Sequence, residues 1–503
     1  MMPKVVGVMV LAWAVSASAG AVASAAPPST PDYTARLAFV AGTALSPYFD
    51  DVAVKTDRPM PWASFVAGRY ETWKGMGRKG GDLGRNADAA VWLALLDEDY
   101  RRNGRLIFER GGKVPGIPRD RWISLRELET EVMPAVIHAP EAFDDPKTAG
   151  EVEDLLRRAG ALHELSWDAL LLEPGAAGGA WRPLPPGTAA AREAAALTAA
   201  YRARDARAGR GAASKLGRLL AAQAGYPPRT RLTLELWLRR SRLFNVAFGL
   251  YVASALSFFG WSAFRKKALA VAGVGGAAAG WVAMTAGIVV RSIVAGYWPT
   301  TGMYEYVTLL AWAVVLFFLL FYARTRQAFL GVIVMPVAFI LVVVASLFPR
   351  DIEGQLVPAL QSWWLTIHVT LACLGEGAFA IAFAAALARI FRDDAKSSRL
   401  PSRAGLAVLE YRAVALGYPL FTVGALIAGA IWAQKAWSAW WSWDPKETAS
   451  LVVFLVATAY LHVRTLRGWR DAGADIVAIL IFVTAVLTLF ANKIFGGLHS
   501  YGV

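Results

Sequence analysis

Residues 303–323 read MYEYVTLLAWAVVLFFLLFYA, an almost uninterrupted run of apolar side chains. An α-helix needs about 20 such residues to cross a bilayer, because each residue advances the helix by only about 1.5 Å. Seven more runs of similar length and hydrophobicity occur in the second half of the chain. The sequence therefore predicts a polytopic membrane protein whose membrane part is all α-helical. The eight predicted spans cover residues 243–261, 268–292, 303–323, 328–348, 363–388, 413–433, 447–466 and 475–495.

The first half of the chain has a different composition. Averaged over 503 residues, the chain is 56% hydrophobic and 18% charged, a balance that a single soluble domain rarely shows. The region before the first span is mixed, charged and rich in arginine. We therefore expect a soluble domain of mixed but mostly helical structure over residues 26–240, followed by an eight-helix transmembrane domain over residues 241–503.

Residues 1–25 have the features of a secretory signal peptide. Lys4 supplies a positive charge, residues 5–15 form a short apolar stretch, and Ala-Ser-Ala at 23–25 is a small-residue cleavage site. The apolar stretch is too short to span a bilayer comfortably. Cleavage after Ala25 would place the mature N-terminus outside the cytoplasm. An uncleaved anchor is the alternative, and in either case the soluble domain is expected to be exported to the periplasm.

The basic residues of the membrane half test this orientation independently, because cytoplasmic loops are enriched in Lys and Arg. Loops that are predicted to be cytoplasmic contain Arg265, Lys266, Lys267, Arg324, Arg326, Arg389, Arg392, Lys396, Arg399, Arg403, Arg412, Arg464, Arg467 and Arg470. External loops and helix ends contain only Arg291, Arg350, Lys435, Lys446 and Lys493. Positive charge in this half therefore reflects topology, and the formal charge of +14 does not indicate nucleic-acid binding.

The cysteine content excludes several classes of redox protein. Cys373 is the only cysteine and lies within a predicted span, so an intramolecular disulfide is impossible. The chain has no Cys-x-x-Cys-His, so it is not itself a c-type cytochrome. It also has no Cys-x-x-Cys pair, which excludes a thiol–disulfide oxidoreductase of that type. We expect Cys373 to be a packing residue.

The densest chemical signal is residues 431–448, which read IWAQKAWSAWWSWDPKET in a predicted external loop. Tryptophan is enriched at membrane boundaries, so an interfacial aromatic belt is the plain interpretation. A belt needs only one or two tryptophans at each helix end, however. Five in one loop favour a broad, flat aromatic surface for a large planar ligand. The five are Trp432, Trp437, Trp440, Trp441 and Trp443.

The end of this segment has the pattern of a helix start. Asp444 stands in the N-cap position, Pro445 in the first helical position and Glu447 in the third, which is the arrangement of a capping box. We therefore favour a structural role for Asp444 over a catalytic one, although its carboxylate leaves the catalytic role open.

Residues 437–448 closely resemble the tryptophan-rich WWD signature of haem-handling proteins in cytochrome c assembly. The similarity is greatest to the CcsA/ResC type of the System II pathway. Residues 296–305, 362–368 and 497–502 resemble further segments of the same family, and all lie on the predicted external face. Ser438 is a departure, because the family usually has glycine at this position. Residues 57–69, 94–96 and 123–125 also resemble the N-terminal extension of longer members.

Two of the five histidines are expected at the height of the tryptophan loop. His368 lies at the outer start of the fifth predicted span, and His499 lies just past the outer end of the eighth. Two imidazoles on opposite faces of a porphyrin form a bis-His iron site. The resemblance implies that His368 and His499 are the family's two external haem ligands. A hydrogen-bonded helix contact is the alternative for a membrane histidine.

The other three histidines are expected to differ from this pair. His462 lies about 22 Å down its helix from Glu447 and matches the family's intramembrane histidine. In the family, the opposing ligand comes from a CcsB/ResB-type partner. His138 and His163 fall in the soluble domain, where we expect ordinary surface or capping residues.

The resemblance implies a function in cytochrome c assembly at the inner membrane. Haem b would be bound as substrate at the outer face and attached by thioether bonds to Cys-x-x-Cys-His of apocytochrome c. This is a holocytochrome c synthase (haem lyase) activity, expected in complex with a CcsB/ResB-type partner. The implied site residues are the five tryptophans and Asp444 around the porphyrin, with His368, His499 and His462 as iron ligands.

Two other functions are compatible with an eight-helix membrane protein. A haem exporter or chaperone would use the same loop and histidines but would pass haem on without forming the covalent bond. A general solute transporter is disfavoured, because the sequence lacks an evident charged or Gly/Pro-broken pair of helices near the bilayer midplane. Haem binding separates the transporter from the other two functions, and covalent product formation separates those two from each other.

The charge bias predicts the outcome of topology reporters. Alkaline phosphatase is active only outside the cytoplasm, so fusions after residues 150 and 440 are expected to be active and fusions after residues 266 and 400 silent. Phosphatase activity in whole cells, normalised to fusion abundance, is the measurement. An active fusion at residue 400 would invert the fifth and sixth spans and move His368 away from the tryptophan loop.

Overall fold

The computed structural model describes most of the membrane half and parts of the first half. The described residues are 53–55, 59–61, 92, 94–96, 98–103, 107–109, 114–115, 117, 121–139, 145–163, 172–173, 182–183, 186–223, 229–348, 350, 352, 356–392, 401–466 and 472–499. The predicted signal peptide lies outside them. The chain separates into two compact units, Met1–Arg239 and Arg240–Val503.

The first unit contains helices and three short antiparallel strand pairs. The pairs are β1 (Ala53–Lys55) with β2 (Pro59–Pro61), β3 (Ile107–Glu109) with β4 (Arg121–Ile123), and β5 (Leu172–Glu173) with β6 (Arg182–Pro183). Its helices are α5 (Glu98–Asn103), α6 (Leu125–Glu127), η2 (Leu128–Val132), α7 (Met133–Ile137), α8 (Pro146–His163), α10 (Ala189–Ala203), α11 (Ala206–Ala221) and α12 (Arg229–Ser241). Trp92, Tyr100 and Leu128 are fully buried and form part of its core.

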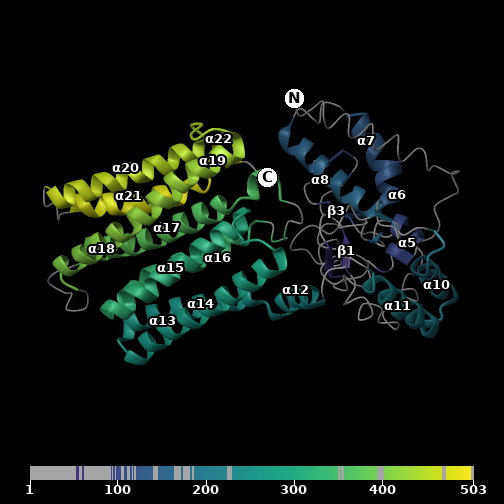
Figure 1. Ribbon diagram of the computed structural model, residues 1–503, viewed down its shortest axis with the longest axis horizontal. Coiled ribbons are helices and arrows are strands. Elements are labelled where there is room, and N and C mark those ends of the chain that lie inside the picture. The colour runs from purple at the N-terminus through teal and green to yellow at the C-terminus, as the bar shows by residue number, and fades with distance from the viewer. Residues whose placement is uncertain are drawn as a thin grey trace. The chain divides into compact units, whose positions relative to one another are not determined.

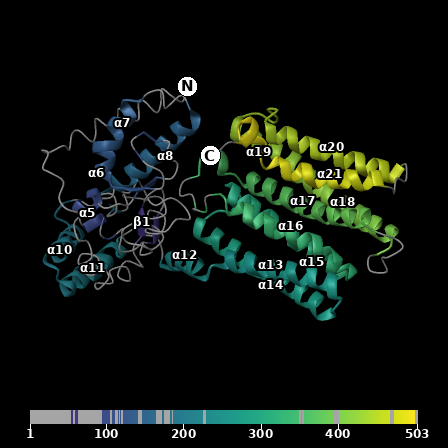
Figure 2. The ribbon, with the colours of Figure 1, turned by 180° about the vertical axis from the view of Figure 1, so that it is seen from behind.

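The second unit is a bundle of long helices with no strand in the part that the structure describes. They are α13 (Leu243–Phe264), α14 (Lys267–Ala295), α15 (Met303–Thr325), α16 (Phe329–Ala345), α17 (Trp363–Ile390), α18 (Arg403–Phe421), α19 (Gly429–Trp437), α20 (Pro445–Leu466), α21 (Ala472–Thr488) and α22 (Ala491–Phe495). Two short irregular helices are η5 (Pro358–Leu360) and η6 (Thr422–Ala428). The bundle is layered, with α17 between the α15–α16 pair and the α20–α21 pair (Figures 1 and 2).

Six helices of the described chain are long and apolar enough to cross a membrane. They correspond to six of the eight predicted spans, and the protein is a multi-pass membrane protein. The other two predicted spans form α16 and α21, which are apolar but only 17 residues long. A helix of that length reaches about 26 Å, slightly less than the hydrocarbon thickness of about 30 Å. Eight crossings therefore stay a prediction.

Glycine lets α17 pack closely against α18 and η6. A Cβ atom on Gly375 would lie 2.7 Å from the Phe421 side chain, and one on Gly417 would lie 2.7 Å from Phe379. Gly424 faces the backbone of Ala372 in the same way. Small residues at such contacts bring helix backbones together in membranes, where packing drives association. The sequence analysis missed this seam, because Gly375 is remote in the chain from Gly417 and Gly424.

Charged side chains are buried at one end of the bundle. Nη1 of Arg389 on α17 lies 2.9 Å from Oδ1 of Asp475 on α21 and 3.7 Å from Oε2 of Glu410 on α18. The Tyr460 hydroxyl on α20 donates a hydrogen bond of 2.7 Å to Glu410. All three charged side chains are at most 3% exposed. The cluster therefore ties four helices together through one guanidinium.

Loss of that guanidinium is expected to destabilise the bundle strongly. Arg389→Met leaves two carboxylates buried without their cation, so the free energy of unfolding should fall by about 3–5 kcal/mol. The measurement is denaturant unfolding of the purified protein in detergent. Arg412→Met is the control, because Arg412 is exposed on α18, and it should change stability by less than about 0.5 kcal/mol. Equal effects of the two changes would contradict the importance of the cluster.

Candidate functional site

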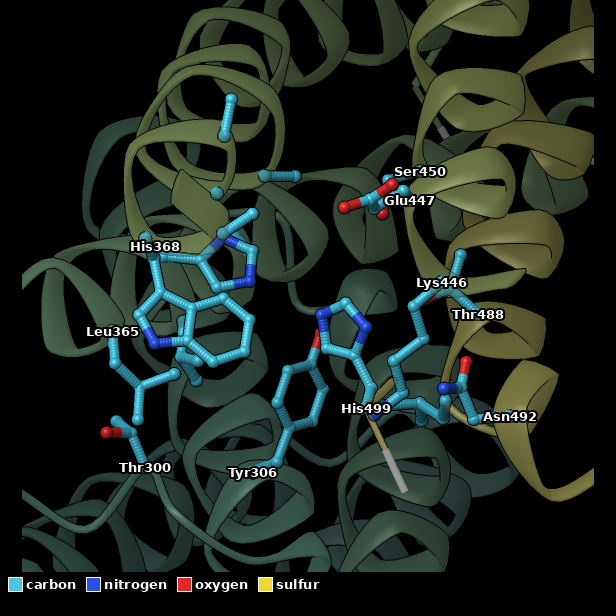
Figure 3. Close-up of a pocket in the computed structure, with 18 of the residues that line it drawn as sticks. Thr300, Tyr306, Leu365, His368, Lys446, Glu447, Ser450, Thr488, Asn492 and His499 are labelled. Atoms are coloured by element: carbon cyan, nitrogen blue, oxygen red, sulfur yellow. The ribbon is translucent and has the colours of Figure 1, made fainter. Parts of the chain in front are cut away.

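The bundle contains a cavity that is lined by several helix ends. Its walls come from the start of α15, the first half of α17, η6 and α19, the start of α20, and the C-terminal segment. Leu365, Val369 and Phe421 contribute apolar surface, and His368 and His499 also line it. Figure 3 shows the two imidazoles on opposite sides of the cavity. The structure thus brings together two histidines that the sequence analysis selected from the fifth predicted span and from the segment after the eighth.

His368 is held by a backbone carbonyl of η6. Its Nδ1 lies 2.9 Å from the carbonyl oxygen of Gly424. A carbonyl can only accept a hydrogen bond, so the proton is on Nδ1 and the lone pair is on Nε2. The π-helical turn from Thr422 to Ala428 offers this carbonyl to α17, and π-helical turns are frequent at functional sites. A Cβ on Gly429 would lie 3.0 Å from the imidazole, so that position also favours glycine.

His499 is held by the carboxylate of Asp444. Its Nδ1 lies 2.7 Å from Oδ1 of Asp444. As at His368, this contact leaves Nε2 as the free ring nitrogen, and neither Nε2 has a hydrogen-bond partner within the described residues. Gly497, with a φ of 137°, brings the C-terminal segment against the carboxylate. A Cβ there would overlap Oδ2 of Asp444, so only glycine fits.

Asp444 is buried and accepts four hydrogen bonds. Oδ1 accepts from the backbone N–H of Lys446 at 3.0 Å as well as from His499, and Oδ2 accepts from the N–H of Leu498 at 2.6 Å and from Asn492 at 3.2 Å. Burial opposes the charged form, but the hydrogen bond and charge of His499 and the backbone N–H groups outweigh it. Together they hold the pKa of Asp444 well below its usual range.

The predicted N-cap role of Asp444 and the return contact from Glu447 are present, but the carboxylate accepts from the second helical N–H and not from the third. The backbone N–H of Asp444 donates to Oε2 of Glu447 at 3.2 Å, while Asp444 caps the N–H of Lys446. The same carboxylate also accepts a hydrogen bond from His499, and the preference for a structural over a catalytic role of Asp444 stays a prediction. The sequence analysis missed the second contact because 54 residues of chain separate Asp444 from Leu498.

Three of the five tryptophans surround the cavity. Trp432 is 2% exposed and stacks on His368 with a ring-centroid distance of 5.9 Å and an interplanar angle of 6°. Its Nε1 donates to the carbonyl of Ala359 at 2.8 Å, which fixes the ring. Trp437 meets both Trp432 and His499 edge to face at 4.8 Å. Trp441 lines the cavity as well.

The rings do not form the single flat surface that the sequence suggested. Trp432 and Trp437 are inclined at 68°, and Trp441 and Trp443 at 90°. Trp440 and Trp443 are 59% and 69% exposed. The loop must turn sharply to return to the membrane, and Trp443 has a φ of 57°, in the left-handed region.

The backbone conformation at Ser438 shows why glycine is usual at this position in the family. Ser438 ends α19 with a φ of 58°, a left-handed conformation that glycine adopts without strain. Serine in this place retains the turn at a modest conformational cost. The departure therefore leaves the backbone path of the loop intact.

Two buried carboxylates near the cavity were missed by the sequence analysis. Glu376 on α17 is 1% exposed, lines the cavity and accepts the Tyr306 hydroxyl at 3.0 Å and 3.1 Å. Glu305 accepts from Arg291 at 3.0 Å and from the N–H and hydroxyl of Thr301 at 2.9 Å, which orders the loop before α15. An acidic residue within an apolar run was the available signal.

His462 and His138 are not among the residues that line this cavity. His462 is exposed on α20, and His138 is exposed at the end of α7. The side chain of His163 lies outside the described residues. Cys373 is fully buried on α17, in agreement with the packing role that its position predicts.

Comparison with known proteins identifies the family. A family model described as cytochrome C assembly protein matches residues 300–499, which contain every cavity residue. A cytochrome c biogenesis protein CcsA from a Synechococcus species is 33% identical over 326 residues, covering 51% of this chain and 93% of the relative. The chain belongs to the CcsA family of cytochrome c biogenesis proteins. CcsA of Gloeobacter violaceus is 33% identical over 320 residues, covering 51% of this chain and 94% of its own length.

A solved structure has a weaker likeness to this CcsA-family chain. It is titled cytochrome c heme lyase CcmF, with a TM-score of 0.42, 16% sequence identity, and coverage of 50% of this chain and 46% of that one. The family model and the CcsA relatives, and not this likeness, establish membership.

Asp444 variants should separate the cap from the contact with His499. Asp444→Ala removes both contacts. The free energy of unfolding should fall by about 1 kcal/mol from loss of the cap and by about 1.5–3 kcal/mol from loss of the charged hydrogen bonds. Asp444→Asn can keep the cap through its amide oxygen, but it loses the charge and the hydrogen bonds at the oxygen that the NH2 group replaces. The measurement is denaturant unfolding in detergent. Asp205→Asn is the matched control, because Asp205 caps α11 through the N–H groups of Arg207 and Ala208.

The stability of wild type and of Asp444→Asn should depend differently on pH. The folded pKa of Asp444 is depressed, so its stabilisation is fully present above the usual value of about 3.9 and is lost as pH falls through the lower folded value. Wild type should therefore lose more stability than Asp444→Asn between about pH 5 and the acid limit. Parallel acid profiles of the two proteins would contradict the assignment.

Proposed function

We propose that this CcsA-family protein binds haem b as a substrate between His368 and His499 and presents it for thioether attachment to apocytochrome c. The observation that carries the proposal is the matched state of the two imidazoles. Each has its Nδ1 engaged by an acceptor, at 2.9 Å for His368 and 2.7 Å for His499, and each has its Nε2 free. This is the state that an axial haem ligand requires.

The donor set favours haem over a bare metal ion. Among the described residues, no group of three or more His, Cys, Asp and Glu side chains could hold a metal ion. Two imidazoles suffice only where a macrocycle supplies the other ligands, as the four pyrrole nitrogens of haem do. The largely apolar wall also suits a porphyrin, which buries a broad apolar face.

Residues around the cavity have distinct roles in this proposal. Trp432 stacks on His368 and also lies 5.3 Å from the His499 ring, and Trp437 packs against His499. Asp444 makes His499 a more basic ligand through its carboxylate, and Gly424 fixes the tautomer of His368. Trp441 supplies apolar surface beside the porphyrin. Trp440 and Trp443 are exposed and would face the incoming apocytochrome.

The proposed reaction needs no nucleophile from this chain. Each thiol of the Cys-x-x-Cys-His segment adds across a vinyl C=C bond of haem. The sulfur bonds to the carbon nearer the ring, and the thiol proton goes to the terminal carbon, so atoms and electrons balance without an oxidant. The protein contributes by fixing the haem, and proximity and orientation supply most of the acceleration.

The partners and location in the proposal follow from the family and from exposed residues. Haem attachment would occur at the outer face of the inner membrane, in complex with a CcsB/ResB-type membrane protein. His462 is exposed on α20, which suits a second haem contact completed by a ligand from that partner. A haem exporter or chaperone that forms no covalent bond is the competing function, because the same cavity would serve it.

Replacement of the histidines tests the site. Purified wild type loaded with haem should show a low-spin spectrum, and His368→Gly and His499→Gly should each weaken haem binding by about 10-fold or more. Added imidazole should restore part of the low-spin spectrum, because it fills the space left by the side chain. His138→Gly, an exposed histidine of the other unit, is the control. Normal spectra in both variants would disprove the bis-His site.

Covalent product separates the two functions. Co-expression with a reporter apocytochrome and a CcsB/ResB-type partner, in cells without their own assembly system, should give covalent haem that survives denaturing electrophoresis. Bound haem in the membrane protein without any covalent reporter would favour the exporter or chaperone.

A further inference from the structure

A bis-His site leaves one property of a bound haem undetermined. Two axial ligands fix the iron and the plane of the porphyrin, but they allow the disk to rotate about the axis that joins them. The vinyl groups and the two propionate carboxylates occupy different parts of the porphyrin edge, so rotation decides which substituents face the incoming thiols. Some group in the cavity wall must therefore fix the rotation.

Lys446 is the cation of the cavity. Of the lining residues that the structure describes, it alone carries a fixed positive charge. Its side chain extends from the start of α20 on the same side of the cavity as His499 (Figure 3). The ammonium is close enough to interact electrostatically with His368 on the opposite wall and with Glu376 on α17. Lys446 therefore lines the same cavity as the two imidazoles and the buried carboxylate.

The neighbouring carboxylates already accept hydrogen bonds from other donors, except at Oε1 of Glu447, which accepts none from the described residues. Both oxygens of Glu376 accept the hydroxyl of Tyr306. Asp444 accepts four hydrogen bonds from other donors, and Oε2 of Glu447 accepts from the backbone of Asp444 and from Ser442. Within the described chain, the Lys446 ammonium itself makes no hydrogen bond and no ion pair. A half-buried ammonium with three free donors is thus directed to an anion that is not part of the chain.

We propose that Lys446 is the anchor for a propionate carboxylate of haem and sets the rotation of the porphyrin in the cavity. The inference rests on the proposed haem site and adds a carboxylate subsite to it. Glu376 and Glu447 also line the cavity, so a propionate that enters without a cation meets like charge in a poorly hydrated space. Burial of a carboxylate under those conditions is unfavourable unless it is paired. The position of Lys446 two residues after the cap residue Asp444 ties this anchor to the element that orients His499.

The subsite is tested by comparing how wild type and Lys446 variants bind haem and an esterified haem. The full-length protein in detergent is titrated with protohaem and with protohaem dimethyl ester, whose two carboxylates are neutral. Wild type should prefer the diacid over the diester by about 10-fold or more, the range of one charge-assisted hydrogen bond. Lys446→Gln should lose that preference but keep the low-spin bis-imidazole spectrum, because both histidines remain. Lys446→Arg should keep most of it.

Controls make each outcome decisive. Lys435→Gln changes an exposed lysine near the end of α19 that does not line the cavity, and it should retain the wild-type preference. The ratio of the two affinities in each variant is divided by the ratio in wild type, so partition of the diester into detergent, which is the same for every protein, cancels. An undiminished preference for the diacid in Lys446→Gln, or no preference in wild type, would overturn the inference while leaving the haem site standing. Failure of wild type to bind either ligand would overturn the proposed function, and this subsite with it.

Discussion

The buried carboxylate of Asp444 connects the parts of the candidate site. It caps the first turn of α20, accepts from Asn492 in α22, and accepts from Leu498 and His499 in the C-terminal segment. A buried anion is tolerated only when its lone pairs are satisfied, so any displacement of these three segments leaves a costly unpaired charge. This requirement fixes the end of the tryptophan loop relative to the C-terminus, although the two are remote in sequence. It also explains why Gly497 must be a glycine, since the backbone passes directly over the carboxylate.

The opposite wall is built without charge. Glycines at 375, 417 and 424 let α17 approach α18 and η6 until the Gly424 carbonyl reaches His368. The two imidazoles therefore have different acceptors, a carboxylate for His499 and a carbonyl for His368. A carboxylate raises the basicity of the imidazole more than a carbonyl does, so the two ligands are not equivalent. In the proposed reaction this difference would decide which imidazole the histidine of apocytochrome c displaces more easily.

Buried ion pairs hold the helices that carry these walls. The Arg291–Glu305 pair orders the loop that precedes α15, and the Arg389 cluster joins α17, α18, α20 and α21 at the other end of α17. Pairs of this kind add little net stability but make misaligned packings costly, because each misalignment exposes an unpaired buried charge. The cavity therefore lies within a frame that has one favourable alignment. A ligand that must be presented edge-first to another protein requires such a frame.

The sequence by itself determined the class of the protein, the approximate course of its spans, the N-cap at Asp444 and the pair of histidines expected at one height. Those features depend on local hydrophobicity, on spacing within one helix, or on a recognisable motif. Only the tertiary structure decided that Asp444 holds His499, that the Gly424 carbonyl holds His368, that Glu376 and Lys446 face the same cavity, and that the tryptophan rings meet edge to face. Each of these contacts joins residues on different helices, and their distances depend on how closely those helices pack. Periodicity and composition along one segment carry no record of that packing.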